Sequence, residues 1–314
     1  MAIAAIIVLC ILLSLLLLLI IISLSLFNVV IVRRPKEFRS TSPDLPMDQY
    51  SELTALHAAW FEKQPFEDLE MMSHDGLLLR GYYLTAKVPT TKTAILAHGY
   101  TGSAEKDMLG FAKMYHEVFG YNVLMPDNRA HGESEGSYIG FGWLDRFDYV
   151  KWIYSMLNRV GPNAQIVLHG MSMGGATVLM TSGEKLPEQV KCVISDCAYT
   201  SVKDILSYQA KRLYKLPAFP LIHLVGFVCK LRAGYTFGEA SVLAQVKKTR
   251  KPILFIHGGE DTFVPTTMLD PLYEASNGPK EKCIIPSAGH GLAYATDVAV
   301  YRQRVSAFLE KFAS

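Results

Sequence analysis

The chain has 314 residues, of which 50% are hydrophobic, and a formal net charge of only +2 at pH 7. That length suits one membrane segment and one large folded domain, and so small a net charge gives no reason to expect a nucleic-acid partner. The five cysteines form no C-x-x-C pair, so neither a disulfide framework nor a zinc site is expected. We expect them to be small buried side chains. They are Cys10, Cys192, Cys197, Cys229 and Cys283.

Residues 2–32 form an almost wholly apolar segment, interrupted only by three serines and one asparagine. A helix of about 20 apolar residues crosses the hydrocarbon core of a bilayer, so this segment can span it with some tilt. A cleaved signal peptide is the alternative, but it would need a basic start, a shorter apolar stretch and a small-residue cleavage site, which this segment lacks. We therefore expect an uncleaved single-pass anchor over residues 1–32.

Basic residues follow the predicted anchor and none precedes it. They are Arg33, Arg34, Lys36 and Arg39. The positive-inside rule then places this flank, and the domain after it, on the cytoplasmic side. Residues 33–65 contain prolines and end in a helix-like stretch around Ser51–Glu62, so we interpret them as a connector to a domain over residues 66–314.

Strand-like and helix-like segments alternate from Phe66 onward, as a mostly parallel sheet flanked by helices requires. Two strands bracket the turn His74–Gly76 as an antiparallel hairpin. Six short, nearly continuous apolar runs follow, which is typical of buried parallel strands. These runs are Thr93–Leu96, Asn122–Met125, Gln165–Leu168, Cys192–Ser195, Pro252–Ile256 and Lys282–Ile285. The sequence therefore predicts an α/β fold with an eight-stranded sheet.

Helices are expected between the strands, over Ala104–Val118, Trp143–Arg159, Gly174–Gly183 and Val298–Phe312. After the sixth strand, the chain inserts a long stretch where a short crossover would suffice. We predict that this insertion, about residues 198–250, is a helical cap. It should lie over the carboxyl ends of the strands, where open α/β sheets bind ligands.

The strongest functional signal is the motif Gly-Met-Ser-Met-Gly-Gly over residues 170–175, between a predicted strand and a predicted helix. In a nucleophile elbow, the sharp turn strains the serine and exposes its hydroxyl, and glycines let the turn close. The N-terminus of the following helix favours developing negative charge. The pattern G-x-S-x-G alone occurs in many unrelated chains, but its place at a strand–helix junction makes Ser172 the candidate nucleophile.

A nucleophilic serine needs a base that takes its proton and a carboxylate that orients the base. Asp261 and His290 each follow a predicted strand, after Ser172 and in the order serine, acid, histidine that accompanies such an elbow. Glu260 is a rival acid, but Asp261 has the better loop position; Asp196 follows an earlier strand. We predict a triad of Ser172, Asp261 and His290.

The developing oxyanion also needs donors, and losing one typically costs about 2.7–4 kcal/mol of barrier. The expected donors are the backbone N–H of Met173, directly after the nucleophile, and that of Tyr100, in the loop after an early strand. His98 in the same loop is expected to brace it rather than to act as an acid or base.

With these residues in place, the chain from about Phe66 to its end resembles a membrane-anchored bacterial α/β-hydrolase of the serine esterase or acylaminoacyl-peptidase-like type. The resemblance rests on the HGYTGS loop, the elbow, and the HGGEDTFVP and AGHG turns around Asp261 and His290. It implies the α/β-hydrolase fold and acyl transfer to water without a metal or other cofactor. It also implies that the loop Asp127–Gly136 braces the sheet edge rather than contacting substrate.

Carboxylic ester hydrolysis is the leading hypothesis, with a small acyl compound as the partner. Amide or peptide hydrolysis by the same triad is the alternative. A catalytically inactive membrane-bound binding module is disfavoured, since the serine, the histidine and the elbow glycines are all present.

The predicted cap carries ten Lys and Arg residues between Cys197 and Lys251, opposed only by Asp204 and Glu239. A solvated helical face accounts for this surplus. The alternative is a lid that rests on anionic headgroups, so that lipophilic acyl compounds reach Ser172 from the bilayer.

Overall fold

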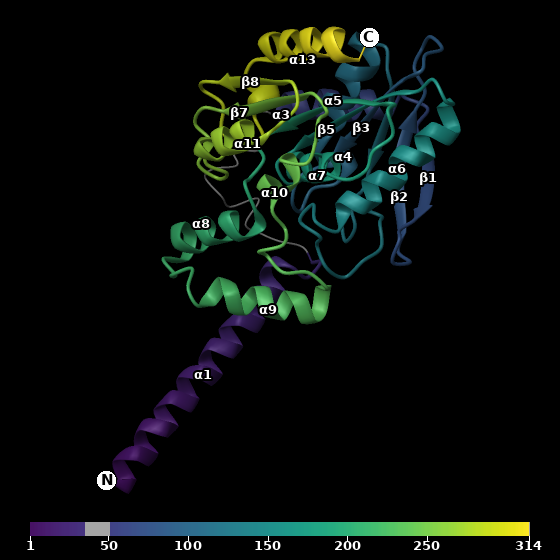
Figure 1. The fold of residues 1–314 in the computed structure, drawn as a ribbon. Helices are drawn as coiled ribbons and strands as arrows, with labels where there is room; N and C mark the ends of the chain where they lie inside the picture. The colour runs from purple at the N-terminus through teal and green to yellow at the C-terminus, as the bar shows by residue number, and fades with distance from the viewer. Residues whose placement is uncertain (35–50, 314) are drawn as a thin grey trace.

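The structure, a computed structural model, describes residues 1–34 and 51–313. A long apolar helix, α1 (Ala2–Val30), projects from a domain in which helices cover a central sheet (Figure 1). Residues 35–50 of the connector predicted over residues 33–65, including Lys36 and Arg39, lie outside the described residues.

Eight strands form one sheet in the order β1-β2-β4-β3-β5-β6-β7-β8. They run over Glu67–Met72 (β1), Leu78–Leu84 (β2), Lys92–Ala97 (β3), Asn122–Pro126 (β4), Gln165–Met171 (β5), Val190–Asp196 (β6), Ile253–Gly258 (β7) and Lys280–Ile285 (β8). β2 is antiparallel to both of its neighbours, and every other pair is parallel. The predicted sheet, with its initial hairpin, is therefore confirmed.

Side chains of the inner strands point alternately into two cores, one on each face of the sheet. On β3, Ile95 and Ala97 belong to one core, while Ala94 and Leu96 belong to the other. Both faces are sealed by helices, which is why these strands read as continuous apolar runs rather than as alternating ones.

The helices of the domain cover both faces and the carboxyl ends of the strands. They are α3 (Ser51–Phe61), α4 (Ala104–Asp107), α5 (Leu109–Lys113), a π-helical turn (Met114–Val118), α6 (Asp145–Val160), α7 (Met173–Ser182), α8 (Val202–Tyr214), α9 (Leu221–Ala233), α10 (Val242–Val246), α11 (Leu269–Ala275), α12 (Ala293–Thr296) and α13 (Val298–Phe312), with a 3-10 turn over Thr266–Met268. α6 and α7 pack into one core, and α5 and α13 pack into the other.

The single helix predicted over Ala104–Val118 is wrong, because the structure divides this stretch into α4, α5 and the π turn. Ser103 caps α4 by accepting a hydrogen bond from the N–H of Lys106. The π turn places the buried side chain of Tyr115 in the core, where its hydroxyl lies 3.1 Å from Nδ1 of His169. These tertiary contacts divide a stretch whose periodicity alone resembles one helix.

The last turns of α1 belong to the core of the domain. Phe27 and Ile31 are completely buried, Val32 forms an antiparallel bridge with Tyr138, and α1 packs against α9. The preceding turns are exposed. By its length and composition, α1 is a candidate membrane span.

The predicted cap is present as α8, α9 and α10. Its side chains bind the loops at the carboxyl ends of the strands: the hydroxyl of Tyr208 donates to the carbonyl of Thr262 over 2.8 Å, and that of Tyr235 donates to the carbonyl of Ile139 over 2.8 Å. The placement of the cap at this edge is therefore confirmed.

Candidate active site

Ser172 occupies the sharp turn between β5 and α7. Its φ of +57° lies in the left-handed region that a residue with a side chain rarely adopts. The turn brings backbones very close together: a Cβ at Gly170 would lie 2.1 Å from the carbonyl oxygen of Gly174, and a Cβ at Gly174 would lie 1.9 Å from that of Ala97. Both glycines are therefore required by packing, and the strained turn presents the Ser172 hydroxyl at the end of β5.

The three predicted side chains lie within hydrogen-bond distance of one another. Oγ of Ser172 lies 2.8 Å from Nε2 of His290, and Nδ1 of His290 lies 2.7 Å from Oδ2 of Asp261. They meet because the strands before them, β5, β7 and β8, are parallel, with β6 between β5 and β7. Met171 pairs with Asp196 across β5 and β6, and Gly258 pairs with Ile285 across β7 and β8. All three are buried, so their contacts are little screened by water.

Asp261 is held as an acceptor for His290. Its Oδ1 accepts hydrogen bonds from the N–H groups of Phe263 at 3.0 Å and Val264 at 2.8 Å. Burial alone would raise the pKa of Asp261, but the adjacent His290 and His257 rings outweigh burial and hold that pKa well below its usual range. A carboxylate can only accept, so Nδ1 of His290 carries the proton and Nε2 is left to accept from the serine hydroxyl.

The two rival acids do not reach the imidazole. Glu260 is exposed on the same loop. Asp196 is buried, and its Oδ2 accepts a hydrogen bond of 3.0 Å from the hydroxyl of Tyr301. Burial raises the pKa of Asp196 to about 6. The carboxylate that lies against His290 is therefore Asp261, the one predicted from the order of the motifs in the sequence.

Both expected oxyanion donors lie beside Ser172. Met173 is the first residue of α7, and Tyr100 lies on the wall of the pocket that contains Ser172 and His290. The ring of Tyr100 packs against Phe141 with 5.0 Å between centroids, and its hydroxyl donates a 2.7 Å hydrogen bond to the carbonyl of Val30 at the end of α1. The loop beside the nucleophile is thus fastened to the N-terminal helix.

His98 braces its loop, as predicted. Its Nε2 accepts a hydrogen bond of 2.9 Å from the N–H of Asn128, and the amide of Asn128 donates back to the carbonyl of His98. The loop Asp127–Gly136 is likewise tied to the backbone, since the two carboxylate oxygens of Asp127 accept from the N–H groups of Ala104 and Glu133. These hydrogen bonds support the expected bracing role of the loop, which stays a prediction.

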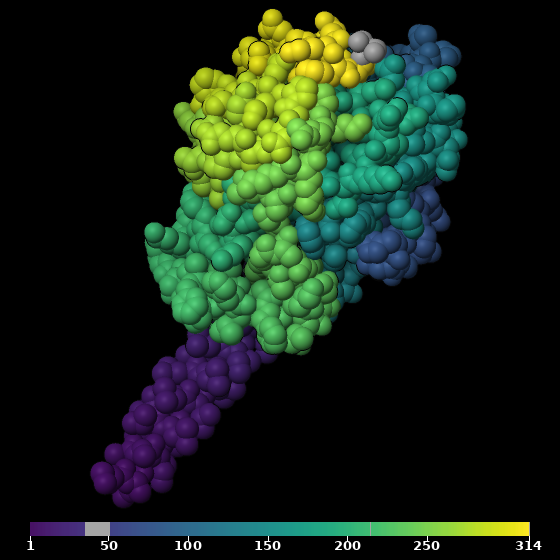
Figure 2. Space-filling view, in the orientation of Figure 1, coloured from purple at the N-terminus to yellow at the C-terminus, as the bar shows by residue number. Residues whose placement is uncertain are grey.

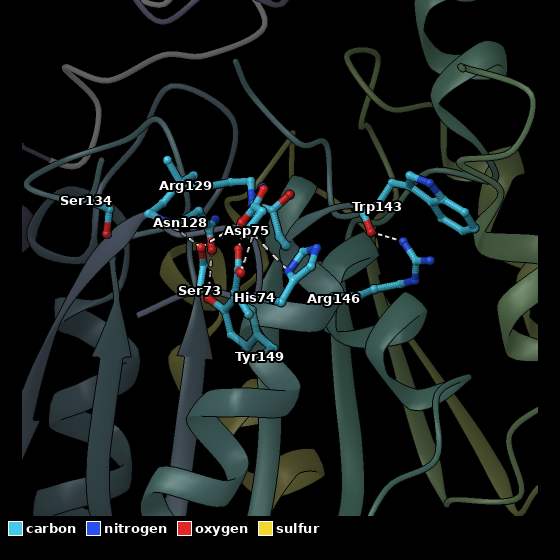
Figure 3. Close-up of polar contacts among 12 residues, drawn as sticks. Ser73, His74, Asp75, Asn128, Arg129, Ser134, Trp143, Arg146 and Tyr149 are labelled. Atoms are coloured by element: carbon cyan, nitrogen blue, oxygen red, sulfur yellow. Dashed lines mark hydrogen bonds and ion pairs between the residues drawn. The ribbon is translucent and has the colours of Figure 1, made fainter. Parts of the chain in front are cut away.

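Within that loop, Arg129 forms a buried ionic cluster that the sequence did not single out. Its guanidinium donates to the carboxylates of Asp148, at 2.7 and 2.8 Å, and of Asp75, at 2.8 and 3.1 Å. Figure 3 shows Arg129 beside Asp75, the residue at the turn of the first hairpin. The cluster therefore joins the hairpin, the loop and α6.

The pocket beside Ser172 has a volume of about 190 Å³. Its apolar wall comes from α3, α5 and the segment after His290, including Leu53, Leu109, Phe111 and Leu292. Among the described residues that line this pocket, none comes from the cap. Helix α3 lines the pocket because it packs on α5.

Trp60 fixes α3 in this position. Its side chain is buried, and its indole N–H donates a 3.0 Å hydrogen bond to Glu117. Leu53, Thr54 and His57, one to two turns earlier on the same helix, then face the pocket. The sequence interpretation treated this helix as part of a connector; its apolar residues and a buried tryptophan were the signal that it packs on the domain.

Comparison with known proteins places this site in a family. A model of the alpha/beta hydrolase fold matches residues 94–227. The chain is 33% identical over 255 residues to the uncharacterized protein YqkD of Bacillus subtilis, an alignment that covers 78% of this chain and 82% of YqkD. The chain belongs to the α/β-hydrolase family.

Solved structures agree with this assignment. The Pyrococcus furiosus esterase Pf2001 superposes on this hydrolase with a TM-score of 0.64 and 25% identity, over 80% of this chain and 92% of the esterase. The acylaminoacyl peptidase of Pyrococcus horikoshii superposes with a TM-score of 0.59 and 17% identity, over 82% of this chain but only 43% of the peptidase. The second likeness concerns the fold alone.

Proposed function

We propose that this protein is a serine hydrolase that cleaves carboxylic esters through an acyl-enzyme on Ser172. The observation that carries the proposal is the continuous chain of contacts from Ser172 Oγ to His290 Nε2, at 2.8 Å, and from His290 Nδ1 to Asp261 Oδ2, at 2.7 Å. Catalytic hydrogen bonds of a nucleophile, its base and the orienting acid fall in this range.

In the first step, Ser172 Oγ attacks the ester carbonyl while Nε2 of His290 takes the hydroxyl proton. The backbone N–H groups of Tyr100 and Met173 stabilise the oxyanion, and Asp261 stabilises the imidazolium. Collapse of the tetrahedral intermediate breaks the bond to the alcohol, which leaves with the proton from Nε2. Water then gives a proton to His290, attacks the acyl-enzyme and releases the acid, and Ser172 regains its proton.

The likeness to an esterase favours ester cleavage over amide cleavage, and the pocket suits the apolar acyl part of such a substrate. The Pf2001 esterase is similar to this chain at 25% identity over most of its own length, whereas the likeness to the peptidase is one of fold. The pocket wall is apolar, with Leu53, Leu109 and Phe111 on it, so it suits the hydrocarbon part of a small acyl compound.

We further propose that α1 is a retained membrane anchor. Removing it as a signal peptide would take Phe27 out of the core and the Val30 carbonyl away from Tyr100. The organisation that follows is an anchor over residues 1–32, a connector over 33–65 and the hydrolase domain over 66–314, with its cap at about 198–250. Arg33 and Arg34 directly after α1 favour a cytoplasmic domain.

The test compares hydrolysis of a short p-nitrophenyl ester with that of the matching anilide. We expect the wild-type chain to cleave the ester, Ser172→Ala to lose at least about 10⁴-fold in kcat, and Ser306→Ala to behave as the wild type. Ser306 is a suitable control because its hydroxyl contacts Glu310 on the surface of α13. Ester hydrolysis that survives in Ser172→Ala would reject the mechanism; faster cleavage of the anilide would reverse the choice of substrate.

A further inference from the structure

We propose that α9 lies in the headgroup layer of the bilayer that α1 spans, with an exposed apolar stripe inserted at the boundary with the acyl chains. The stripe consists of Phe219, just before α9, and of Phe227 and Leu231 on it. This inference rests on the proposed role of α1 as an anchor, and it adds a second, peripheral membrane contact made by the cap. Its partner is the surface of an anionic bilayer.

The length of the exposed part of α1 locates the membrane boundary. The turns from Ala2 to Ile21 are exposed apart from Leu19, which is half-buried. At 1.5 Å per residue this stretch is about 30 Å long, which matches the hydrocarbon core. From Ile22 onward the helix packs on the domain. The helix therefore leaves the hydrocarbon where it meets the domain.

α9 is the element that α1 meets at this boundary. The two helices pack together, and the guanidinium of Arg232 lies 5.7 Å from the centroid of the Phe27 ring. α9 closes the side of the domain from which α1 projects (Figure 1), and Figure 2 shows the green atoms of the cap around that point. If α1 spans the bilayer, α9 is held at its surface.

The outer side of α9 exposes large apolar side chains as well as polar ones. Its inner side buries Leu221, Ile222, Val225 and Cys229 in the core. Its outer side carries Phe227 and Leu231, which are four residues apart and therefore share one face, and Phe219 lies just before the helix. Phe219 is 74% exposed, Phe227 62% and Leu231 71%. The large apolar side chains exposed here lie beside exposed basic residues, as on an amphipathic helix that rests on a bilayer surface.

Positive charge surrounds the stripe. Lys211, Lys215, Lys230 and Arg232 are exposed on or beside α8 and α9. Lys230 contacts Glu239 at 3.3 Å but is itself about half exposed. An amphipathic surface with basic residues beside aromatic and leucine side chains binds anionic bilayers at the boundary of headgroups and acyl chains.

The test measures the depth of three labelled positions in the full chain, reconstituted in vesicles of phosphatidylcholine and phosphatidylglycerol. An environment-sensitive fluorophore is attached to native Cys10 in α1, or to Phe227→Cys or Val88→Cys in a Cys10→Ser background. The remaining cysteines are buried. Val88 is 73% exposed and precedes β3, so it lies at the edge of the sheet opposite the cap. Quenching is recorded with nitroxides placed near the headgroup or deep in the acyl chain.

We expect the label at position 227 to be quenched severalfold more strongly than that at 88, and more by the shallow nitroxide than by the deep one. Cys10, near the middle of the exposed part of α1, should be quenched most by the deep nitroxide. Quenching at 227 no stronger than at 88, with Cys10 quenched, would overturn the placement of α9 and leave the anchor standing. Absence of quenching at Cys10 would overturn both.

A second copy of the chain is the competing occupant of the stripe. In that case the label at 227 would be shielded from both nitroxides, and Phe227→Cys chains would cross-link to one another across the stripe. This pattern would also overturn the proposal. Replacing phosphatidylglycerol with phosphatidylcholine should weaken the quenching at 227 and leave that at Cys10 unchanged, because only the α9 contact depends on the basic residues.

Discussion

The hydroxyl of Tyr100 donates a 2.7 Å hydrogen bond to the main-chain carbonyl of Val30. One partner lies on the pocket wall beside Ser172, and the other is the last residue of α1. Because the backbone N–H of Tyr100 is a proposed oxyanion donor, this bond links the N-terminal helix to the position of a catalytic group.

Tyr100→Phe tests that link. The phenyl ring can still pack on Phe141, but the bond to Val30 is lost, and a neutral hydrogen bond contributes about 0.5–1.5 kcal/mol. We expect kcat for an ester to fall by about 2- to 10-fold with little change in KM. The matched control is Tyr235→Phe in the cap, which removes a 2.8 Å hydrogen bond from the buried Tyr235 hydroxyl to the carbonyl of Ile139. Equal kcat values for the two variants would limit the Tyr100 hydroxyl to a structural role.

Asp196→Asn should alter the pH dependence of stability. Burial raises the pKa of Asp196 to about 6, above the unfolded value of about 3.9. The Asp196 carboxyl therefore contributes fully to the free energy of unfolding below about pH 4. This contribution is lost as the pH rises through about 6, because the folded state must then hold a buried charge. We expect the variant to gain about 3 kcal/mol relative to the wild type between those two pH values.

The measurement is chemical unfolding of the detergent-solubilised chain at both ends of that range. If the free energy of unfolding changes with pH in the same way for the wild type and Asp196→Asn, the raised pKa of Asp196 is contradicted.

The same variant also separates the roles of the two acids. Asp196→Asn should keep its esterase activity, whereas Asp261→Asn should lose about 10⁴-fold in kcat, because the imidazole loses its orienting carboxylate.

Leu53→Ala tests whether α3 shapes the substrate pocket. Leu53 lines the pocket, so its truncation should enlarge the pocket and favour esters with longer acyl chains. Each additional methylene that the pocket accommodates should lower the activation free energy derived from kcat/KM by about 1–3 kcal/mol. Leu56→Ala, on the same helix but 63% exposed, should leave the chain-length profile unchanged. If Leu53→Ala and Leu56→Ala have the same chain-length profile, the acyl chain does not bind against Leu53.

Arg129→Ala tests the structural reading of the loop Asp127–Gly136. It leaves the buried carboxylate of Asp148 without its partner, which costs about 3–5 kcal/mol. The control is Arg80→Ala, whose pair with Glu70 is solvent-exposed and contributes about 0–1 kcal/mol. We expect unfolding at lower denaturant for Arg129→Ala, with unchanged KM in the folded fraction. A raised KM with unchanged stability would instead assign the loop to substrate binding.

The positions of the strands along the chain and the meeting point of Ser172, Asp261 and His290 could be predicted because both depend on local patterns. Buried parallel strands are continuous apolar runs, and residues that follow neighbouring parallel strands meet at one edge of the sheet. The catalytic roles of these residues stay a prediction that the geometry supports.

The pocket wall and the fastening of α1 could not be predicted in the same way. They depend on contacts between segments far apart in the chain, such as Trp60 with Glu117 and Val30 with Tyr100. Neither contact can be recognised from the pattern of apolar and polar residues in the segments that make it. The break in the helix predicted over Ala104–Val118 has the same origin, since the buried contact of Tyr115 with His169 overrides local periodicity.

Fluorophosphonate labelling followed by peptide mapping tests the central claim most directly, because the reagent modifies a serine only when a base activates it. The claim predicts a single phosphonylated peptide carrying the label on Ser172, with labelling abolished in Ser172→Ala and slowed at least severalfold in His290→Ala. Labelling at another serine, or equal labelling of wild type and His290→Ala, would contradict it.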